Sequence, residues 1–119
     1  MQNKRELGYL KETKAIEYLK KHKIKILKRN YYAKTGEIDI IGKEIDTIVF
    51  FEVKYRKTGK FGFAQDSITK DKKKKLFATA LCFLSENNIK NINLRFDGIF
   101  INNDTIEWIK NIIWSDEIE

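Results

Sequence analysis

Two neighbouring segments of the sequence carry acidic and basic side chains at a spacing that suits metal-assisted chemistry. Asp39 lies in the segment GEIDII, and Glu52 and Lys54 lie two residues apart in the apolar segment TIVFFEVKY. Because side chains alternate between the faces of a strand, Glu52 and Lys54 share one face. A pairing that sets Asp39 beside Glu52 brings together two carboxylates, whose repulsion a hard divalent cation relieves. The pattern therefore predicts a Mg²⁺ or Mn²⁺ site formed by Asp39 and Glu52, since oxygen ligands suit these metals.

Such a site predicts hydrolysis of a phosphodiester bond. A divalent metal would polarise a phosphoryl oxygen and activate water, while Lys54 would stabilise the developing negative charge. The alternative is that Glu52, Lys54 and Arg56, which share one face of their strand, form the wet side of an antiparallel sheet. The single cysteine and the single histidine, Cys82 and His22, do not favour a zinc site or a nucleophile with a histidine base.

Glu12 is an acidic residue on an apolar helix face. Residues 5–22 predict a helix in which Gly8, Ala15 and Leu19 recur along one side, with Glu12 in the middle of that side. An unpaired buried carboxylate costs several kcal/mol, so Glu12 must be paired, protonated, exposed in a cleft or bound to a cation. A structural ion pair is the alternative to a functional role.

The order of the remaining elements predicts the fold class. Residues 24–32 favour an extended segment, and 37–41 and 47–55 favour an antiparallel hairpin with a polar connection from Gly42 to Asp46. Further elements follow: a helix with Thr69 as N-cap and its end near Glu86, burying the apolar stretch 81–84, a strand at 92–101, and a hairpin partner at 105–109. We expect an α/β fold in which the second helix crosses over to lay its following strand beside the hairpin.

Length and composition add a domain count and a compartment. A chain of 119 residues suits a single domain, with a core at about 5–101 and an acidic C-terminal extension at 102–119. No apolar run reaches the ~18 residues of a membrane span, so no membrane partner is expected. One cysteine cannot form an internal disulfide, which favours a cytoplasmic protein.

The basic excess predicts a polyanionic partner. The net charge is +7, but five acidic residues and one lysine give 102–119 a net charge of −4, which leaves the rest of the chain at +11. Such a body is typical of proteins that bind nucleic acid through its phosphates. A lysine-rich solvated surface, or a face that meets acidic proteins, are the alternatives. The predicted phosphate contacts are Arg56, Lys57, Lys60, Lys70, Lys72 and Lys73.

These residues also resemble a known pattern. GEIDII at 36–41 followed by IVFFEVKYR at 48–56 looks like the PD-(D/E)xK nuclease signature. Over about residues 7–101 the chain resembles the YraN family of small bacterial proteins, which are predicted to be endonuclease-like and are distantly similar to archaeal Holliday junction resolvases. The other matching positions are Gly8, Glu12, Ala15, Leu19, Arg29, Asn30, Phe61, Gly62, Lys72 and 95–97.

The resemblance implies a restriction-endonuclease-like αβββαβ core, with a central mixed sheet flanked by helices. It implies a metal-dependent, structure-selective DNA endonuclease, with Asp39 and Glu52 as metal ligands, Lys54 as catalytic lysine and Glu12 as an additional acid. Lys11 and Ser67 stand where the family has glycine and alanine. A nucleic-acid-binding module that keeps this fold without turnover is the alternative. Cleavage of both strands of a junction would also imply a homodimer, because it needs two sites related by a two-fold axis.

Overall fold

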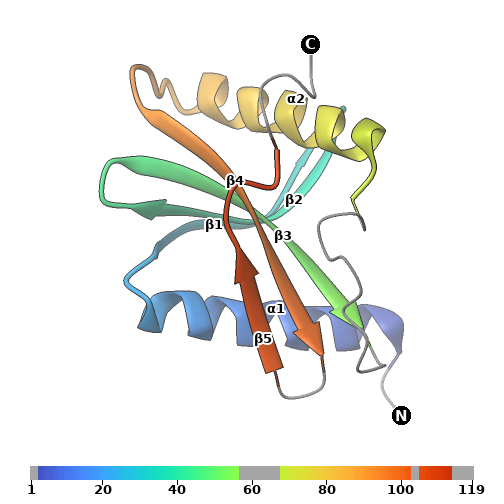
Figure 1. Cartoon of the computed structure of the whole chain (residues 1–119). Helices are drawn as coiled ribbons and strands as arrows, with labels where there is room; N and C mark the ends of the chain where they lie inside the picture. Colours follow the sequence, from blue (N-terminus) through green and yellow to red (C-terminus); the bar gives the residue numbers. More distant parts are fainter. Residues whose placement is uncertain (1–2, 57–67, 103–104, 114–119) are drawn as a thin grey trace.

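A computed structural model describes residues 3–56, 68–102 and 105–113 of the chain. Its elements are α1 (Lys4–Lys21), β1 (Lys25–Ala33), β2 (Gly36–Glu44), β3 (Thr47–Arg56), α2 (Lys70–Glu86), β4 (Asn93–Asn102) and β5 (Thr105–Ile109). The strands form one five-stranded sheet in the order β1-β2-β3-β4-β5, with the two helices packed against it (Figure 1). The expected α/β class is confirmed.

The sheet is mixed because the connection through α2 returns the chain so that β4 runs parallel to β3, whereas the other strand pairs are antiparallel. β1, β2 and β3 pair antiparallel, β3 and β4 pair parallel, and β4 and β5 pair antiparallel. The predicted crossover is therefore confirmed. The expected polar connection from Gly42 to Asp46 is too long, since Gly42 pairs with Val49 and only Ile45 and Asp46 remain in the turn. Ile45 has a φ of 56°, in the left-handed region that such a tight turn requires.

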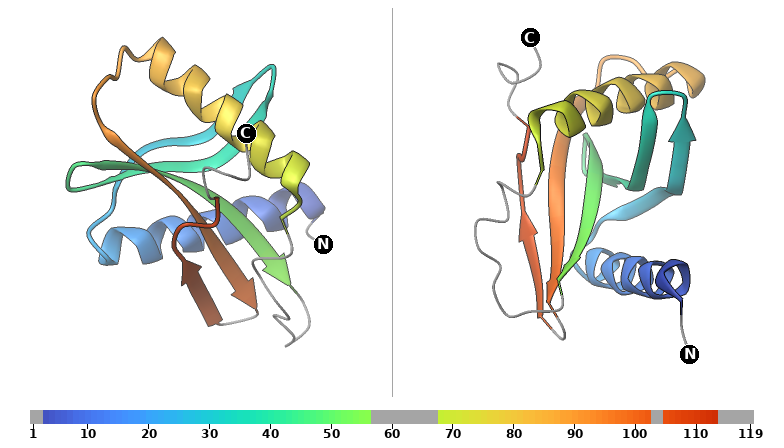
Figure 2. Two further views of the ribbon diagram at one scale, coloured as in Figure 1. Left: turned by 45° about the horizontal axis from the view of Figure 1, so that its top comes forward. Right: turned by 90° about the vertical axis from the view of Figure 1, so that its right-hand side faces the viewer.

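The two helices cover opposite faces of the sheet, as the edge-on view in Figure 2 shows. On one face, Leu76, Ala80 and Phe83 of α2 pack against a cluster that includes Phe50 and Phe100. On the other face, Ala15 and Leu19 of α1 pack against Ile40, Val49, Phe51, Ile99 and Ile101. Because both faces are covered, the central strands β3 and β4 are apolar on both sides.

Two expectations about helix burial are wrong. Gly8 was expected on the packed face of α1 but is exposed, and only Ala15 and Leu19 of that helix are buried, because its first turns extend beyond the core. Leu81 was expected in a buried stretch but is 47% exposed. The sheet-facing stripe of α2 runs through Leu76, Ala80 and Phe83, and Leu81 projects from another side of the helix. The predicted N-cap is confirmed, since the Thr69 hydroxyl accepts a hydrogen bond from the Lys72 N–H at 3.1 Å.

The fully buried carboxylate of Asp97 accepts hydrogen bonds from residues in and after β5. Asp97 on β4 accepts hydrogen bonds from Arg95 Nε at 3.0 Å, from Trp108 Nε1 at 2.9 Å and from the Asn111 N–H at 3.0 Å. Arg95 in turn donates to Glu44 Oε1 at 2.9 Å. Arg95 and Asp97 thus link β5 and the residues after it to β4 and to the end of β2. Neither described helix is long and apolar enough to cross a membrane.

Candidate active site

Asp39 lies where the regular pairing of β2 with β3 stops. The register runs from Glu44 opposite Thr47 to Ile40 opposite Phe51, and the next bond is made by a side chain, since Asp39 Oδ2 accepts from the Val53 N–H at 2.8 Å. The alternation of β2 also breaks there. Ile38 packs on the α2 side of the sheet, whereas Ile40 packs on the α1 side. The kink brings the Asp39 carboxylate against the backbone of the residue that follows Glu52.

Asp39 is the most strongly perturbed carboxyl group among the described residues. Burial, and next the negative charge of Glu52, raise the pKa of Asp39 from its ordinary value of 3.8 to about 7. The hydrogen bond from Val53 works in the opposite direction. The structure therefore brings together the two carboxylates that were expected to meet, in an arrangement where their repulsion matters.

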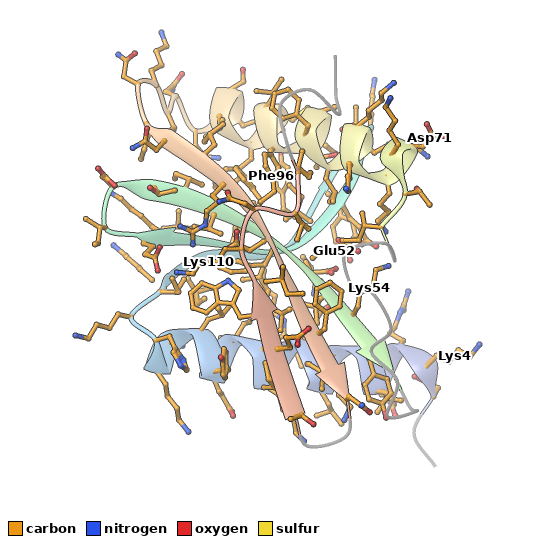
Figure 3. All side chains as sticks on the ribbon, viewed as in Figure 1. Lys4, Glu52, Lys54, Asp71, Phe96 and Lys110 are labelled. Atoms are coloured by element: carbon orange, nitrogen blue, oxygen red, sulfur yellow. The ribbon has the colours of Figure 1, made fainter. Side chains whose placement is uncertain are left out.

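Glu52 is buried beside two lysines. The residue is 5% exposed, and its Oε1 lies 3.2 Å from Lys72 Nζ and 3.6 Å from Lys54 Nζ. The alternative of a wet sheet face is wrong for Glu52, because α2 covers that face and delivers Lys72 to it. Figure 3 places Glu52 and Lys54 between the N-terminal ends of the two helices, at the end of the molecule where Lys4 also lies.

Lys72 therefore forms an ion pair with Glu52, in addition to any contact it makes with phosphate. The sequence placed Lys72 among the predicted phosphate contacts and the family-matching positions, without linking it to Glu52. The signal for its position is the N-cap at Thr69, which sets the phase of α2. The Lys72 side chain is 43% exposed, so it contacts solvent as well as Glu52. Lys72 therefore belongs with Lys54 around Glu52.

Glu12 has an ionic partner and also lines a cleft. Arg29 Nε lies 3.6 Å from Glu12 Oε1, so the carboxylate has an ionic partner. Burial nevertheless raises the pKa of Glu12, against the opposing effect of Arg29. Glu12 also lines an open cleft of about 420 Å³ together with Glu37 and Asp39.

Several residues of this cleft were missed by the sequence analysis. Lys4 and Arg5 from the start of α1 line it, as do Tyr9 and Tyr32. Lys4 precedes Gly8 by four residues, and Gly8 precedes Glu12 by four, so helical spacing alone could have placed Lys4 about two turns before Glu12 toward the same side of α1. Tyr32 gives no such signal, because only the register of β1, in which it pairs with Glu37, places it there.

A larger cleft lies elsewhere. It measures about 620 Å³ and is formed between β1 and the C-terminal half of α2, with Lys28, Tyr31, Tyr32 and Glu86 among its lining residues. Glu86 is its one lining acid. We assign the candidate site to the smaller cleft and the adjoining Glu52 group, because the perturbed carboxyl groups gather there.

The donor set suits a magnesium-like ion that keeps part of its hydration shell. Among the described residues, no group of three or more His, Cys, Asp or Glu side chains is placed to hold a metal ion. Mg²⁺ is commonly held by one or two carboxylates, with waters and substrate phosphates completing its shell. Asp39 and Glu52 fit that limited role, and the raised pKa of Asp39 is what a nearby cation would reverse.

The other predicted phosphate contacts are only partly within the described residues. Lys70 is exposed and Lys73 is half-buried, both in the first turns of α2. Arg56 ends β3, but its side chain lies outside the described residues, as do Lys57 and Lys60. The described basic groups at the carboxylates are therefore Lys54 and Lys72 beside Glu52 and Arg29 beside Glu12, while Lys4 and Arg5 line the cleft.

Comparison with known proteins identifies the family. Residues 11–101 match the family described as uncharacterised protein family UPF0102. The chain belongs to the UPF0102 family. A UPF0102 protein of Fusobacterium nucleatum is 42% identical over 116 residues, which cover 98% of each chain. One of Caldicellulosiruptor saccharolyticus is 50% identical over 97 residues, or 82% of each chain, and one of Aliivibrio fischeri strain MJ11 is 43% identical over 116 residues, or 94% of each.

The family match spans the carboxylates of the candidate site and the lysines at Glu52, but not Lys4, Arg5 and Tyr9 of the cleft. Its bounds enclose Glu12, Asp39, Glu52, Lys54 and Lys72, whereas β5 lies beyond them. The names of the UPF0102 relatives state no reaction.

Proposed function

We propose that this UPF0102 protein is a metal-dependent endonuclease that hydrolyses DNA phosphodiester bonds at particular structures. The observation that supports it most is the buried position of Asp39 beside Glu52: burial, and next the charge of Glu52, raise the pKa of Asp39 to about 7 inside a chain with a net charge of +7. Burying two neighbouring carboxylates costs folding free energy, because their charges repel. Such a costly arrangement is typical of a site that binds a cation or a substrate. The fold is compatible with a restriction-endonuclease-like core.

Each residue then has a distinct task. Mg²⁺ or Mn²⁺, when bound, would supply a Lewis acid that lowers the pKa of water and neutralises charge on the phosphate. Asp39 and Glu52 would hold it, and the Val53 N–H fixes the Asp39 carboxylate in place. Lys54 would stabilise the charge that develops on the phosphate, while Lys72 would share the neutralisation of Glu52. Glu12, on the cleft side, would accept a proton or a hydrogen bond.

The basic residues supply the affinity for the phosphate backbone. Lys70 and Lys73 on α2, with Arg56, Lys57 and Lys60, would contact phosphates on either side of the site. Such contacts position a duplex without reading its bases, which favours recognition of shape over sequence. A homodimer would follow if both strands of a junction are cut. The one cysteine, Cys82, is free, in accordance with a cytoplasmic setting.

The deciding experiment is cleavage of end-labelled junction, flap and linear DNA with Mg²⁺ or Mn²⁺. We expect metal-dependent cleavage that Glu52→Gln and Lys54→Ala each reduce by about 100-fold or more. Glu107→Gln, which changes an exposed acid on β5, is the matched control and should cleave normally. No cleavage of any substrate, with no effect of metal on DNA binding, would overturn the enzymatic proposal.

One observation favours a second candidate. Glu52 already has two lysine partners, as a purely structural acid would. A nucleic-acid-binding module without turnover would keep its DNA affinity in Lys54→Ala and would have no activity to lose. The same variant therefore separates the two functions.

A further inference from the structure

Two exposed tyrosines flank the carboxylates of the candidate site. Tyr9 on α1 is 55% exposed and Tyr32 on β1 is 66% exposed, although large aromatic side chains contribute most when they are buried. Both line the cleft of about 420 Å³ that also holds Glu12 and Asp39. They come from elements that are distant in sequence, so the fold itself brings the two rings to one cleft.

The Tyr9 ring is held on one face. The Arg29 guanidinium lies 3.7 Å from the centre of that ring, and Arg29 Nη2 also donates to the Tyr9 carbonyl oxygen at 2.6 Å. Arg29 is itself paired with Glu12. The ring is therefore fixed in orientation while more than half of the residue stays open to solvent, which is a preorganised surface for another flat group.

Tyr32 stands on the edge strand between the two clefts and lines both of them. Among the residues that the structure describes, no ring stacks on Tyr32 and no group hydrogen-bonds to its hydroxyl. Its backbone is fixed by the pairing of Tyr32 with Glu37. A rigid strand thus presents an aromatic side chain to solvent beside the perturbed acid Asp39.

The charges of the cleft select a base over a phosphate. Glu12, Glu37 and Asp39 line its wall and would repel the backbone phosphates, but their oxygens can accept hydrogen bonds from the amino groups of bases. Lys4 and Arg5, from the first turn of α1, lie at the same cleft and can hold the phosphates attached to such a base. The cleft volume falls in the ~300–1,000 Å³ range of ligand sites, which admits one nucleotide.

We propose that Tyr9 and Tyr32 stack an unpaired nucleotide beside the carboxylates, so that the substrate is DNA with unpaired nucleotides next to the scissile bond. This rests on the proposed endonuclease function and names its substrate class. In a continuous duplex the faces of each base are covered by its neighbours, and only a base outside the helix can use an exposed ring. Flaps, overhangs and branch points meet this condition.

Binding in the absence of cleavage tests the inference. Fluorescence anisotropy in EDTA compares a blunt duplex with the same duplex that carries a short single-stranded overhang, with 2-aminopurine in the overhang as a stacking probe. We expect the overhang to bind about 5- to 150-fold more tightly and the 2-aminopurine fluorescence to be quenched. Tyr32→Ala should remove most of this difference, whereas Tyr32→Phe should keep it.

Leu10→Ala is the matched control, since Leu10 is an exposed apolar residue of α1 outside this cleft. Equal affinity for the two duplexes, alongside Mg²⁺-dependent cleavage, would overturn the stacking site and leave the endonuclease standing. A Phe variant as defective as the Ala variant would also overturn stacking, because the ring would then not be the recognised group. If the protein neither binds nor cleaves any DNA, the proposed function fails as well.

Discussion

Asp39 Oδ2 accepts a hydrogen bond from the backbone N–H of Val53 at 2.8 Å, directly beyond the last regular pair of β2 with β3. A side chain therefore replaces the backbone acceptor that a regular strand would have supplied. Because Val53 directly follows Glu52 in β3, this bond holds the Asp39 carboxylate close to Glu52. The candidate site depends on this irregularity of the sheet.

The first prediction concerns pH. The pKa of Asp39 lies at about 7 in the folded protein against 3.8 ordinarily, so between these values the folded state binds more protons than the unfolded state. The contribution of Asp39 to stability is thus complete below about pH 4 and is lost as the pH rises through about 7. Asp39→Asn should raise the free energy of unfolding of the metal-free protein by about 1–3 kcal/mol near pH 8.

Urea denaturation in EDTA at about pH 5 and about pH 8 measures this effect. Asp46→Asn, which changes an exposed aspartate in the β2–β3 turn, serves as the control. A variant Asp39→Asn with the same pH dependence as the unmodified protein would show that Asp39 is not the titrating group.

The second prediction concerns metal binding. Saturating Mg²⁺ or Mn²⁺ should raise the stability of the protein, by about 2.7 kcal/mol at a concentration of 100 times the dissociation constant. The gain should vanish in Asp39→Asn and Glu52→Gln but persist in Glu107→Gln. Thermal unfolding with and without the metal is the measurement, and an equal shift in all of these variants would place the ion elsewhere.

The third prediction concerns the two lysines at Glu52. Lys54→Ala or Lys72→Ala alone leaves one cation beside a carboxylate that is 5% exposed, so each should cost only about 1 kcal/mol of stability. The double variant leaves a buried charge without either ion pair and should cost about 3–5 kcal/mol.

A double-mutant cycle from urea unfolding tests this non-additivity. Lys74→Ala, at an exposed position of the same helix, is the control. Strictly additive losses would mean that the lysines do not share the neutralisation of Glu52.

The fourth prediction separates structure from function at Asp97. Arg95→Met removes the main partner of a carboxylate that is 0% exposed and should destabilise the protein by about 3–5 kcal/mol. Trp108→Phe removes one hydrogen bond to a charged acceptor and should cost about 1.5–3 kcal/mol. DNA cleavage per folded molecule should be unchanged in both, and a specific loss of activity in Trp108→Phe would contradict the structural role. Lys90→Met, at an exposed lysine between α2 and β4, is the control.

The sequence by itself determined the elements and the chemistry they could carry. Period-two and helical patterns located the two helices and five strands of the described residues, because local hydrophobic spacing indicates which side of an element is buried. The same spacing singled out Glu12, Asp39, Glu52 and Lys54, since charged residues within apolar segments need a reason. The parallel crossover followed from chain order.

Only the tertiary structure decided how these residues meet. The kink at Asp39, the arrival of Lys72 at Glu52, and the placement of Tyr9 and Tyr32 at one cleft all depend on register and on the docking of α1 and α2. Local patterns carry no information about register or docking, because these are set by long-range packing of both core clusters at once. The sequence thus identifies the acidic residues of the candidate site, whereas strand register and helix docking determine which residues surround them.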